Sequence, residues 1–402
     1  MRGGRIRAPA AVEGTPLRIL LAAVEPSGDG LGAALLQSLR KQAPPNTEYF
    51  GCGGPLMERE GFQSLFAIDS LSVMGFSEVV RALPLGFRRA KDLAQLAARK
   101  QADIAVFIDG WAFSRVGAKR LRQYSPRTAV YKFAAPQVWA SRPKRVDFVR
   151  RYFSGVLTLL PFEPAYFKAV GVRAKFVGNP NFQAAWAARG DGAAFRRRYE
   201  LGQDTQVLAV LLGSRISEFR RLEPRFRETV ERLRARLPNL AVIALLAPSI
   251  TEAARHALEG WPTPPMFIGA EEKYDAFAGV DAALAVSGTV TTELAINATP
   301  MIIAYRVDPL TAFWARRVMT TPFASVLNFA AGRAVIPEFL QENCTPDAMA
   351  DALETLLTDE EARRAQCESF RPLLEMLELS GPSAADRAAR TILSWIADDD
   401  DL

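Results

Sequence analysis

The feature that most constrains the fold is a unit that recurs along the chain: a short apolar run, a polar turn and a helical segment. The first unit has its apolar run at residues 17–24, its turn at 25–30 and its helical periodicity at 31–39. Buried strands that alternate with helices are typical of parallel sheets with helices on both faces. Further apolar runs lie at 104–108, 129–133, 156–160 and 174–177, and again at 206–212, 240–246, 265–268, 282–286 and 301–305. We therefore predict an α/β fold.

These runs fall into two series, which predict two doubly wound, Rossmann-like domains. A chain of 402 residues is too long for one ordinary core and suits two. We expect the domains to face a cleft, the arrangement called GT-B. The predicted parts are a flexible extension at 1–16, an N-terminal domain at 17–183, a linker at 184–201, a C-terminal domain at 202–365, and C-terminal helices at 366–402 that pack back on the N-terminal domain and end in an acidic tail.

The scarcity of histidine limits the kinds of catalytic and metal-binding site that the chain can form. The single histidine, His256, lies in a helical stretch, which argues against most metal sites and most histidine-based triads. A carboxylate is therefore the expected general base. The three cysteines, Cys52, Cys344 and Cys367, lack the spacing of metal ligands and fit a reducing compartment.

The charge balance suits an anionic partner. Lysine and arginine outnumber the acids 50 to 44, a formal net charge of +6. Nucleotide phosphates, a phosphorylated lipid and an acidic bilayer surface all fit this balance. No nucleic-acid motif is present, so we expect no nucleic acid as a partner. No apolar run reaches the about 18–20 residues of a membrane span, and residues 1–16 do not read as a secretory signal.

Two turns of the first series carry candidate site residues, because ligands of open α/β sheets bind beyond the carboxyl ends of the strands. The turn at 25–30 contains Ser27, read as a helix cap, and Gly28, suited to a tight turn. An ordinary strand-to-helix turn is the alternative, and the G-x-G-x-x-G spacing of dinucleotide sites is missing. Asp109 follows an apolar strand and suits a base that takes a proton from an acceptor hydroxyl, with helix capping as the alternative.

One turn of the second series suits a pyrophosphate. Gly213 lets the backbone approach a ligand, Ser214 can cap the next helix, and Arg215 offers a rigid fork of donors. A helix cap followed by a surface arginine is the alternative.

A second turn of that series leads from a strand into a helix. Ser287, Gly288 and Thr289 precede first-turn amides that favour a phosphate, and Glu293 lies where it can accept from ribose hydroxyls. A capping box is the alternative.

The stretch at 73–93 interleaves large apolar residues with cations, which suits the interface of an anionic bilayer. A core-facing amphipathic helix with a solvated basic edge is an equal alternative. The residues expected at the membrane or at acyl chains are Met74, Val80, Leu83, Leu85, Phe87, Arg88 and Arg89.

A set of motifs, in one order from about residue 17 to 350, resembles the lipid-A-disaccharide synthase family. They include Glu25-x-Ser-Gly-Asp, Pro136-x-Val-Trp-Ala, Gly213-Ser-Arg, Ser287-Gly-Thr-x-x-x-Glu293 and Ala331-Gly-Arg333. The resemblance implies an inverting, metal-independent transfer of 2,3-diacylglucosamine from its UDP derivative to the 6-hydroxyl of 2,3-diacylglucosamine 1-phosphate. The UDP-sugar is then a substrate, and no cofactor is expected.

The resemblance also implies roles for residues and domains. Asp109 matches the family's proposed base and Arg215 the arginine that acts on phosphate charge. The first domain takes the acceptor and the membrane side, the second takes the UDP-sugar, and the enzyme lies on the cytoplasmic face of the inner membrane; a homodimer is left open. The substrate- and UDP-binding positions are Glu25, Ser27, Gly28, Asp29, Gly213, Ser214, Ser287, Gly288, Thr289, Glu293, Asn328 and Gln341.

The chain departs from the family pattern at several turns. Gly178-Asn-Pro180, for example, stands where the family has Gly-His-Pro. A diverged relative that uses another UDP-sugar or acceptor, or one that binds lipid or nucleotide without catalysis, is therefore the alternative function.

Overall fold

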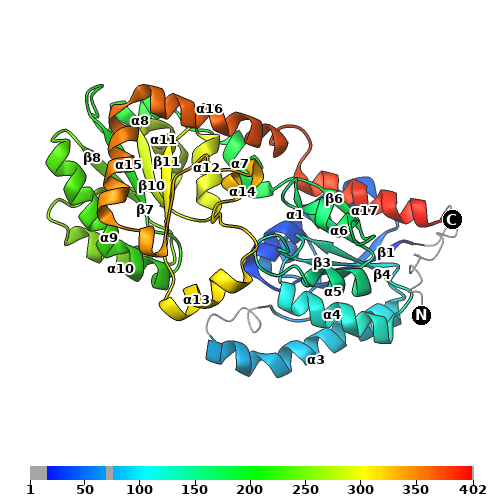
Figure 1. Ribbon diagram of the computed structural model, residues 1–402. Helices are drawn as coiled ribbons and strands as arrows, with labels where there is room; N and C mark the ends of the chain where they lie inside the picture. Colours follow the sequence, from blue (N-terminus) through cyan, green and yellow to red (C-terminus); the bar gives the residue numbers. More distant parts are fainter. Residues whose placement is uncertain (1–15, 69–75, 401–402) are drawn as a thin grey trace. The chain divides into compact units, whose positions relative to one another are not determined.

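The computed structural model describes residues 16–68 and 76–400 of the chain (Figure 1). The chain divides into two compact units: the first runs to Pro180 and resumes at Gly381, and the second is Asn181–Ser380. The predicted extension at 1–16 lies outside the described residues except for its last residue.

The first unit is built on a six-stranded parallel sheet. Its strands are β1 (Arg18–Ala23), β2 (Glu48–Cys52), β3 (Ile104–Ile108), β4 (Ala129–Phe133), β5 (Gly155–Thr158) and β6 (Arg173–Phe176). They lie in the order β2-β1-β3-β4-β5-β6. In β1, Ile19 and Leu21 enter the core on one face, and Leu20 and Ala22 enter the core on the other. Burial on both faces explains why these strands are continuous apolar runs.

Helices cover both faces of this sheet. They are α1 (Pro26–Gln42), α2 (Pro55–Arg59), α3 (Phe76–Lys100), α4 (Trp111–Tyr124), α5 (Arg145–Tyr152), α6 (Glu163–Lys168) and α17 (Ala384–Asp400). α1 and α17 pack on one face, and α3, α4 and α5 on the other (Figure 1). The Ser38 hydroxyl of α1 donates to the Asp386 carboxylate of α17 at 2.7 Å, so the end of the chain completes the first unit.

The second unit contains another six-stranded parallel sheet. Its strands are β7 (Val207–Leu211), β8 (Ala241–Leu245), β9 (Met266–Ile268), β10 (Ala282–Val286), β11 (Met301–Tyr305) and β12 (Glu338–Leu340). Their order is β12-β11-β10-β7-β8-β9.

Helices also cover both faces of the second sheet. The helices of this unit are α7 (Pro180–Ala187), α8 (Gly192–Arg198), α9 (Ile216–Arg236), α10 (Thr251–Glu259), α11 (Lys273–Gly279), α12 (Thr289–Ile296), α13 (Pro309–Val318), α14 (Val326–Ala331), α15 (Pro346–Thr358) and α16 (Glu360–Met376). One core holds side chains of α9, α10 and α15, and the other holds those of α8, α11, α12, α14 and α16.

The predicted linker at 184–201 is wrong, because this segment belongs to the second unit. Phe195 of α8 is buried in the core of that unit. A Cβ atom at Gly192 would clash with the carbonyl oxygen of Ala278 in α11, so the two backbones are in close contact. The predicted C-terminal helices at 366–402 are also divided, since α16 packs in the second unit and α17 in the first.

The prediction of two doubly wound domains is confirmed, and each predicted strand is present. The pattern does not predict β2 or β12, which lie at sheet edges and are short or partly exposed. The prediction of a turn at 25–30 is wrong, because α1 already begins at Pro26. Proline is favoured at the first position of a helix, where its missing N–H costs nothing.

Each sheet has one point at which the strand order reverses. This point lies between β1 and β3 in the first unit, and between β7 and β10 in the second. Ligands of doubly wound sheets bind outside the carboxyl ends of the strands at such points. Residues 25–27 and Asp109 follow the first pair of strands, and residues 213–215 and 287–289 follow the second pair. The fold therefore gathers most of the predicted site residues at two places.

Candidate active site

Two carboxylates and a hydroxyl lie together beyond β1 and β3. The Ser27 hydroxyl donates to the Asp109 carboxylate, with 2.6 Å between Oγ and Oδ2. The sequence predicts that Ser27 caps α1. Instead, its hydroxyl bonds to Asp109. A Cβ atom at Gly110 would lie 3.3 Å from Oε1 of Glu25, so the Glu25 carboxylate lies against the same turn. Burial raises the pKa of Glu25, and the negative charge of Asp109 raises it further.

The backbone of Asp109 is left-handed. Its φ angle is 50°, and Gly110 follows with 48°. Such a conformation costs a non-glycine residue about 1–3 kcal/mol and persists only where neighbours enforce it. The Asp109 N–H donates to the Phe133 carbonyl at 3.0 Å. The Asp109 carbonyl accepts from the Ser114 hydroxyl at 2.9 Å and from the Lys132 side chain at 2.6 Å.

Lys132 is a buried lysine in β4, with 1% of its surface exposed. Besides Asp109, its Nζ donates to the carbonyls of Phe133 at 2.9 Å and Phe107 at 3.5 Å. Burial lowers the pKa of Lys132 to about 7, and the negative charges of Asp109 and Glu25 oppose this effect. The turn that carries Asp109 is thus held by a group whose charge changes near neutral pH.

Gly28 and Asp29 serve packing within the first unit. A Cβ atom at Gly28 would lie 3.1 Å from the carbonyl oxygen of Ile108, so glycine lets α1 approach β3 closely. Asp29 is 2% exposed, and its carboxylate accepts three backbone N–H groups of residues 54–57 at 2.8–3.1 Å. The predicted substrate contact of Asp29 is not supported, because this buried carboxylate is used to cap α2.

The turn after β7 presents an exposed arginine. Gly213 has a φ angle of 83°, and Arg215 occupies the N-cap position of α9, which receives no side-chain hydrogen bond. Ser214 is exposed and does not cap the helix, contrary to the prediction. The Arg215 side chain is 72% exposed, and its Nη1 lies 2.6 Å from Oε1 of the buried Glu218. This hydrogen bond raises the pKa of Arg215 and fixes one end of the guanidinium group.

The turn after β10 leaves the start of α12 open. The Ser287 hydroxyl donates to the Ala324 carbonyl at 2.8 Å and thereby anchors the neighbouring loop. Gly288 occupies the N-cap position without a side-chain cap, and a Cβ atom there would meet nothing within 4 Å. Thr289 is exposed. The first amides of α12 therefore lie at an accessible surface, as an anion site requires.

Glu293 of α12 is mostly buried and forms an ion pair. Its Oε2 lies 2.6 Å from Nζ of Lys273, the first residue of α11. Lys273 also lies 4.8 Å from the ring centroid of Tyr274. The sequence predicts Glu293 as a site residue but does not predict its lysine partner.

The side chains of Asn328 and Gln341 bond to other protein groups near β12, an edge strand of the second sheet. Asn328 is fully buried, and its amide nitrogen donates to the Ile336 carbonyl at 2.8 Å and to Glu338 at 2.7 Å. Its oxygen accepts two backbone N–H groups, so the structure does not support the predicted contact of Asn328 with the UDP-sugar. Gln341 follows the edge strand β12, and its Oε1 accepts from the Val307 N–H at 3.4 Å.

The predicted membrane segment falls partly within α3. Phe87 is 47% exposed and Arg88 is exposed, whereas Leu85 is half-buried. Met74 and the side chains of Val80 and Leu83 lie outside the described residues.

Arg89 differs from its neighbours because it packs against the protein. Its guanidinium carbon lies 4.9 Å from the ring centroid of Phe66, and its Nη1 lies 3.8 Å from Oδ2 of Asp92. The expected membrane contact of Arg89 is therefore not supported.

Three polar residues of these sites were not predicted from the sequence: Lys132, Lys273 and Glu338. Lys132 had a visible signal, since it is a lysine inside an otherwise apolar strand. Lys273 and Glu338 had none, because their partners are far away in the sequence. Glu338 accepts from the N–H groups of Ala324 and Ser325 at 2.7 and 2.9 Å, and so supports the loop that Ser287 anchors.

Within residues 16–68 and 76–400, no group of three or more His, Cys, Asp or Glu side chains is arranged to hold a metal ion. No helix in the same part of the chain is long and apolar enough to cross a membrane.

Comparisons with known proteins agree on one family. The family model "Lipid-A-disaccharide synthetase" matches residues 19–392. The chain is 39% identical to a lipid-A-disaccharide synthase of Rhodospirillum centenum over 95% of both chains. It is 41% identical to one of Paramagnetospirillum magneticum over 94% of this chain and 97% of the relative. Among solved structures, UDP-GlcNAc 2-epimerase of Neisseria meningitidis, bound to UDP-GlcNAc, has a TM-score of 0.58 and 8% identity over 96% of this chain and 100% of that one.

Proposed function

Because this chain belongs to the lipid-A-disaccharide synthase family, we propose that it joins two acylated glucosamine units by an inverting glycosyl transfer. The chain is a glycosyltransferase of lipid A biosynthesis. The donor is the UDP derivative of 2,3-diacylglucosamine, and the acceptor is 2,3-diacylglucosamine 1-phosphate. The acceptor 6-hydroxyl attacks C1 of the donor sugar, the bond from C1 to the phosphate oxygen breaks, and UDP leaves with the bonding electrons.

The observation that carries the mechanism is the left-handed Asp109, which accepts a hydrogen bond from Ser27 at a topological switch point. In the proposed mechanism, the Asp109 carboxylate takes the proton of the acceptor hydroxyl as the new bond forms. Ser27 orients the carboxylate through one of its oxygens. A well-placed general base contributes about 10²- to 10⁴-fold to the rate.

Lys132 is the positioning residue for this base. Its Nζ donates a hydrogen bond to the Asp109 carbonyl, and the side chain is buried. Lys132 therefore contacts the turn and not the substrate. Its positive charge also lowers the pKa of Glu25, against the raising effects of burial and Asp109. Lys132 therefore links the geometry of the turn to the ionisation of Glu25.

The second unit receives the UDP group. The exposed guanidinium of Arg215 and the open first turns of α9 and α12 present positive charge and N–H donors near the ends of β7 and β10. Such groups stabilise the negative charge that develops on a leaving diphosphate. We expect no metal and no cofactor, because these groups supply the charge that the leaving group needs.

Glu293 accepts hydrogen bonds from the ribose hydroxyls in this proposal. Its pairing with Lys273 fixes one carboxylate oxygen and leaves the other for the ligand. The fold shared with a protein that is bound to UDP-GlcNAc supports a UDP-sugar as the ligand.

The acylated substrates place the enzyme at a membrane. We propose peripheral association with the cytoplasmic face of the inner membrane, where the exposed Phe87 and Arg88 of α3 contact the bilayer. An aromatic residue beside a cation suits the interface of an anionic bilayer.

The test is UDP release by the purified protein with the diacylated donor and the 1-phosphate acceptor. We expect acceptor-dependent release that falls about 10²- to 10⁴-fold in Asp109→Ala. The matched control is Asp204→Ala, which removes an exposed aspartate of the second unit and leaves release unchanged. Release from a non-acylated UDP-sugar in preference to the acylated donor contradicts the proposed substrate. Normal release by Asp109→Ala contradicts the proposed base.

A further inference from the structure

Three arginines lie at the carboxyl edge of the first sheet, near the turn that carries Asp109. Arg142 lies in the loop after β4, Arg145 is the first residue of α5, and Arg115 lies in the first part of α4. We call these three residues the arginine cluster. β3 and β4 are neighbours in the sheet, and α4 and α5 follow their carboxyl ends. Because α4 begins at Trp111, directly after the turn of Asp109, the cluster and the proposed base share one edge of the sheet.

Aromatic rings hold two of these arginines in place. The guanidinium carbon of Arg145 lies 5.6 Å from the ring centroid of Trp111, and that of Arg115 lies 5.1 Å from the ring centroid of Phe148. The rings of Trp111 and Phe148 are in edge-to-face contact, with their centroids 5.7 Å apart. Nη1 of Arg145 also donates to the Gln137 carbonyl at 3.5 Å. The two guanidinium groups are thus positioned by one pair of rings between α4 and α5, which lie side by side (Figure 1).

The positive charge of the arginine cluster is not neutralised by the protein. In the part of the chain that the structure describes, no carboxylate forms an ion pair with Arg115, Arg142 or Arg145. Burial lowers the pKa of Arg145, and the positive charges of Arg142 and Arg115 lower it further. Arg145 also lies at the start of α5, where the helix dipole disfavours a cation. Like charges held together in this way favour the binding of an anion.

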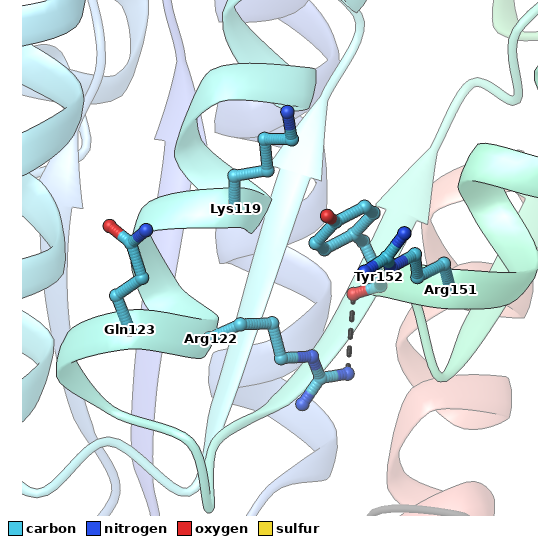
Figure 2. Close-up of a pocket in the computed structure, with 5 residues that line it drawn as sticks. All are labelled: Lys119, Arg122, Gln123, Arg151 and Tyr152. Carbon is cyan, nitrogen blue, oxygen red and sulfur yellow. Dashed lines mark hydrogen bonds between the residues drawn. The ribbon is translucent and has the colours of Figure 1, made fainter. Parts of the chain in front are cut away.

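The cations further along the same helices are arranged differently. They surround a hollow of about 520 Å³ that is lined by Lys119, Arg122, Gln123, Arg151 and Tyr152 (Figure 2). Arg122 donates to the Tyr152 carbonyl at 3.2 Å, so part of its guanidinium group is used by the backbone. Lys119 lies about two helical turns beyond Trp111 and is therefore further from the turn of Asp109. These cations belong to the same helices and provide a control for the arginine cluster.

The acceptor of the proposed reaction brings an anion to this edge of the sheet. In the proposed mechanism Asp109 takes the proton of the 6-hydroxyl, so the acceptor sugar lies beside the turn of Asp109. The 1-phosphate is attached across the same sugar ring. A phosphomonoester carries about two negative charges and three acceptor oxygens. Guanidinium groups bind such oxygens through paired N–H donors. A phospholipid head group offers phosphate oxygens as well, but as a phosphodiester of lower charge.

We propose that the arginine cluster binds the phosphate of the acceptor, a sugar 1-phosphate, and so orients the sugar with its 6-hydroxyl toward Asp109. This inference rests on the proposed function and deepens it, because it assigns a recognition site to the anomeric phosphate. The cluster takes no part in the chemical step. It distinguishes the phosphorylated acceptor from the same sugar without phosphate.

The test compares two acceptors in detergent micelles that contain no phospholipid: 2,3-diacylglucosamine 1-phosphate and 2,3-diacylglucosamine with a free 1-hydroxyl. We expect the wild type to prefer the phosphorylated acceptor. In Arg145→Ala, kcat/KM for that acceptor alone falls about 10- to 100-fold. Arg145→Lys recovers only part of the loss, since lysine lacks the planar fork. The KM of the donor and the affinity for UDP are unchanged, which also reports that the variants are folded.

A second variant and a second measurement support the first. Arg142→Ala removes an exposed side chain and is expected to lower the same preference. Calorimetric binding of the phosphorylated acceptor without donor is expected to weaken in Arg145→Ala and in Arg142→Ala. The matched control is Lys119→Ala/Arg151→Ala, which removes two exposed cations of the hollow in Figure 2 and keeps the wild-type preference.

Three results overturn the proposal. The first is an equal loss with both acceptors in Arg145→Ala and Arg142→Ala, and the second is an equal loss of preference in the control variant. The third is unchanged acceptor binding in micelles together with weaker binding of the variants to phospholipid vesicles, which assigns the cluster to lipid head groups.

The two measurements separate this proposal from the proposed function. A wild type that binds the phosphorylated acceptor through the arginine cluster but releases no UDP fails the proposed function alone. A wild type that releases UDP equally well with both acceptors fails the present proposal alone.

Discussion

The two topological switch points share one geometry and differ in the burial of their charged side chains. In the first unit the charged groups lie within the fold: Lys132 is buried and Glu25 is half-buried, and burial shifts the pKa of both. In the second unit Arg215 is largely exposed, and its pKa is raised by hydrogen bonding to Glu218. Burial lowers the pKa of Lys132 to about 7, whereas the exposed guanidinium of Arg215 stays permanently charged.

The difference in burial matches the two tasks that the proposed mechanism gives to the two units. In the proposed mechanism, proton transfer falls to the first unit, where burial shifts the pKa of Glu25 and Lys132. The proposed stabilisation of a diphosphate falls to the second unit, which has an exposed arginine and open helix starts. The comparison therefore predicts that variants of the first unit change pH dependence and variants of the second change UDP binding. The following tests run from the largest expected effect on turnover to the smallest.

Arg215→Ala is expected to lower kcat/KM for the donor by about 10²- to 10³-fold, because a fixed positive charge at the leaving group is lost. Arg215→Lys recovers only part of this, since lysine lacks the planar fork. Arg220→Ala, an exposed arginine further along α9, is the control and stays near wild type. Steady-state kinetics and calorimetric UDP binding provide the measurements. An Arg215→Ala enzyme with normal UDP affinity and turnover would remove the phosphate role of the second unit.

Lys132→Met is expected to lower kcat about 10²-fold, because the turn that carries Asp109 loses its anchor. The acid limb of the pH profile moves to higher pH where it reports Glu25, since the positive charge that lowers the pKa of Glu25 is gone. UDP affinity is unchanged, which also reports that the variant is folded. Lys175→Met, an exposed lysine of β6, is the control. A lower rate with an unmoved pH profile would show that Lys132 acts only as structural support.

Glu163→Gln tests burial in the first unit away from the chemistry. Burial raises the pKa of Glu163 to about 7, although the Trp139 indole donates to its carboxylate at 3.2 Å. Between about pH 4.5 and 7 the unfolded chain has released this proton and the folded chain has not. The free energy of unfolding therefore falls as pH rises through this window, by about 3 kcal/mol from this group.

Urea unfolding at pH 5 and pH 8 measures the effect. We expect the wild type to lose more stability between these pH values than Glu163→Gln, with turnover at neutral pH little changed. Glu252→Gln, an exposed glutamate of α10, keeps the wild-type dependence. Equal pH dependence in Glu163→Gln and the wild type would mean that the burial of this carboxyl group does not govern its ionisation.

The sequence predicts most of the sheet and only part of the site. β3, β4, β10 and β11 have the predicted bounds, because central parallel strands are apolar on both faces and end at polar or small residues. β2 begins with an exposed Glu48, and β12 has only three residues, so neither forms a complete apolar run. Edge strands are half-solvated, and their pattern is correspondingly weak.

The site residues divide in the same way. Asp109 and Arg215 are predicted by their place after a strand, which is a local property of the sequence. Asp29 and Asn328 are predicted through the family resemblance, yet their side chains bond to backbone groups of the fold. Residue type and position alone do not distinguish a carboxylate or an amide that faces a ligand from one that caps a buried turn.

The order of residues thus predicts two parallel sheets, the ends of their central strands and the family. These properties follow from apolar periodicity and from residue identity, which need no knowledge of distant neighbours. The meeting of distant polar groups becomes visible in three dimensions alone: Lys132 with Asp109, Lys273 with Glu293, and the cations of α4 with those of α5. Burial and charge interact through space, so the pKa of a group and the surface it forms depend on contacts that the order of residues does not display.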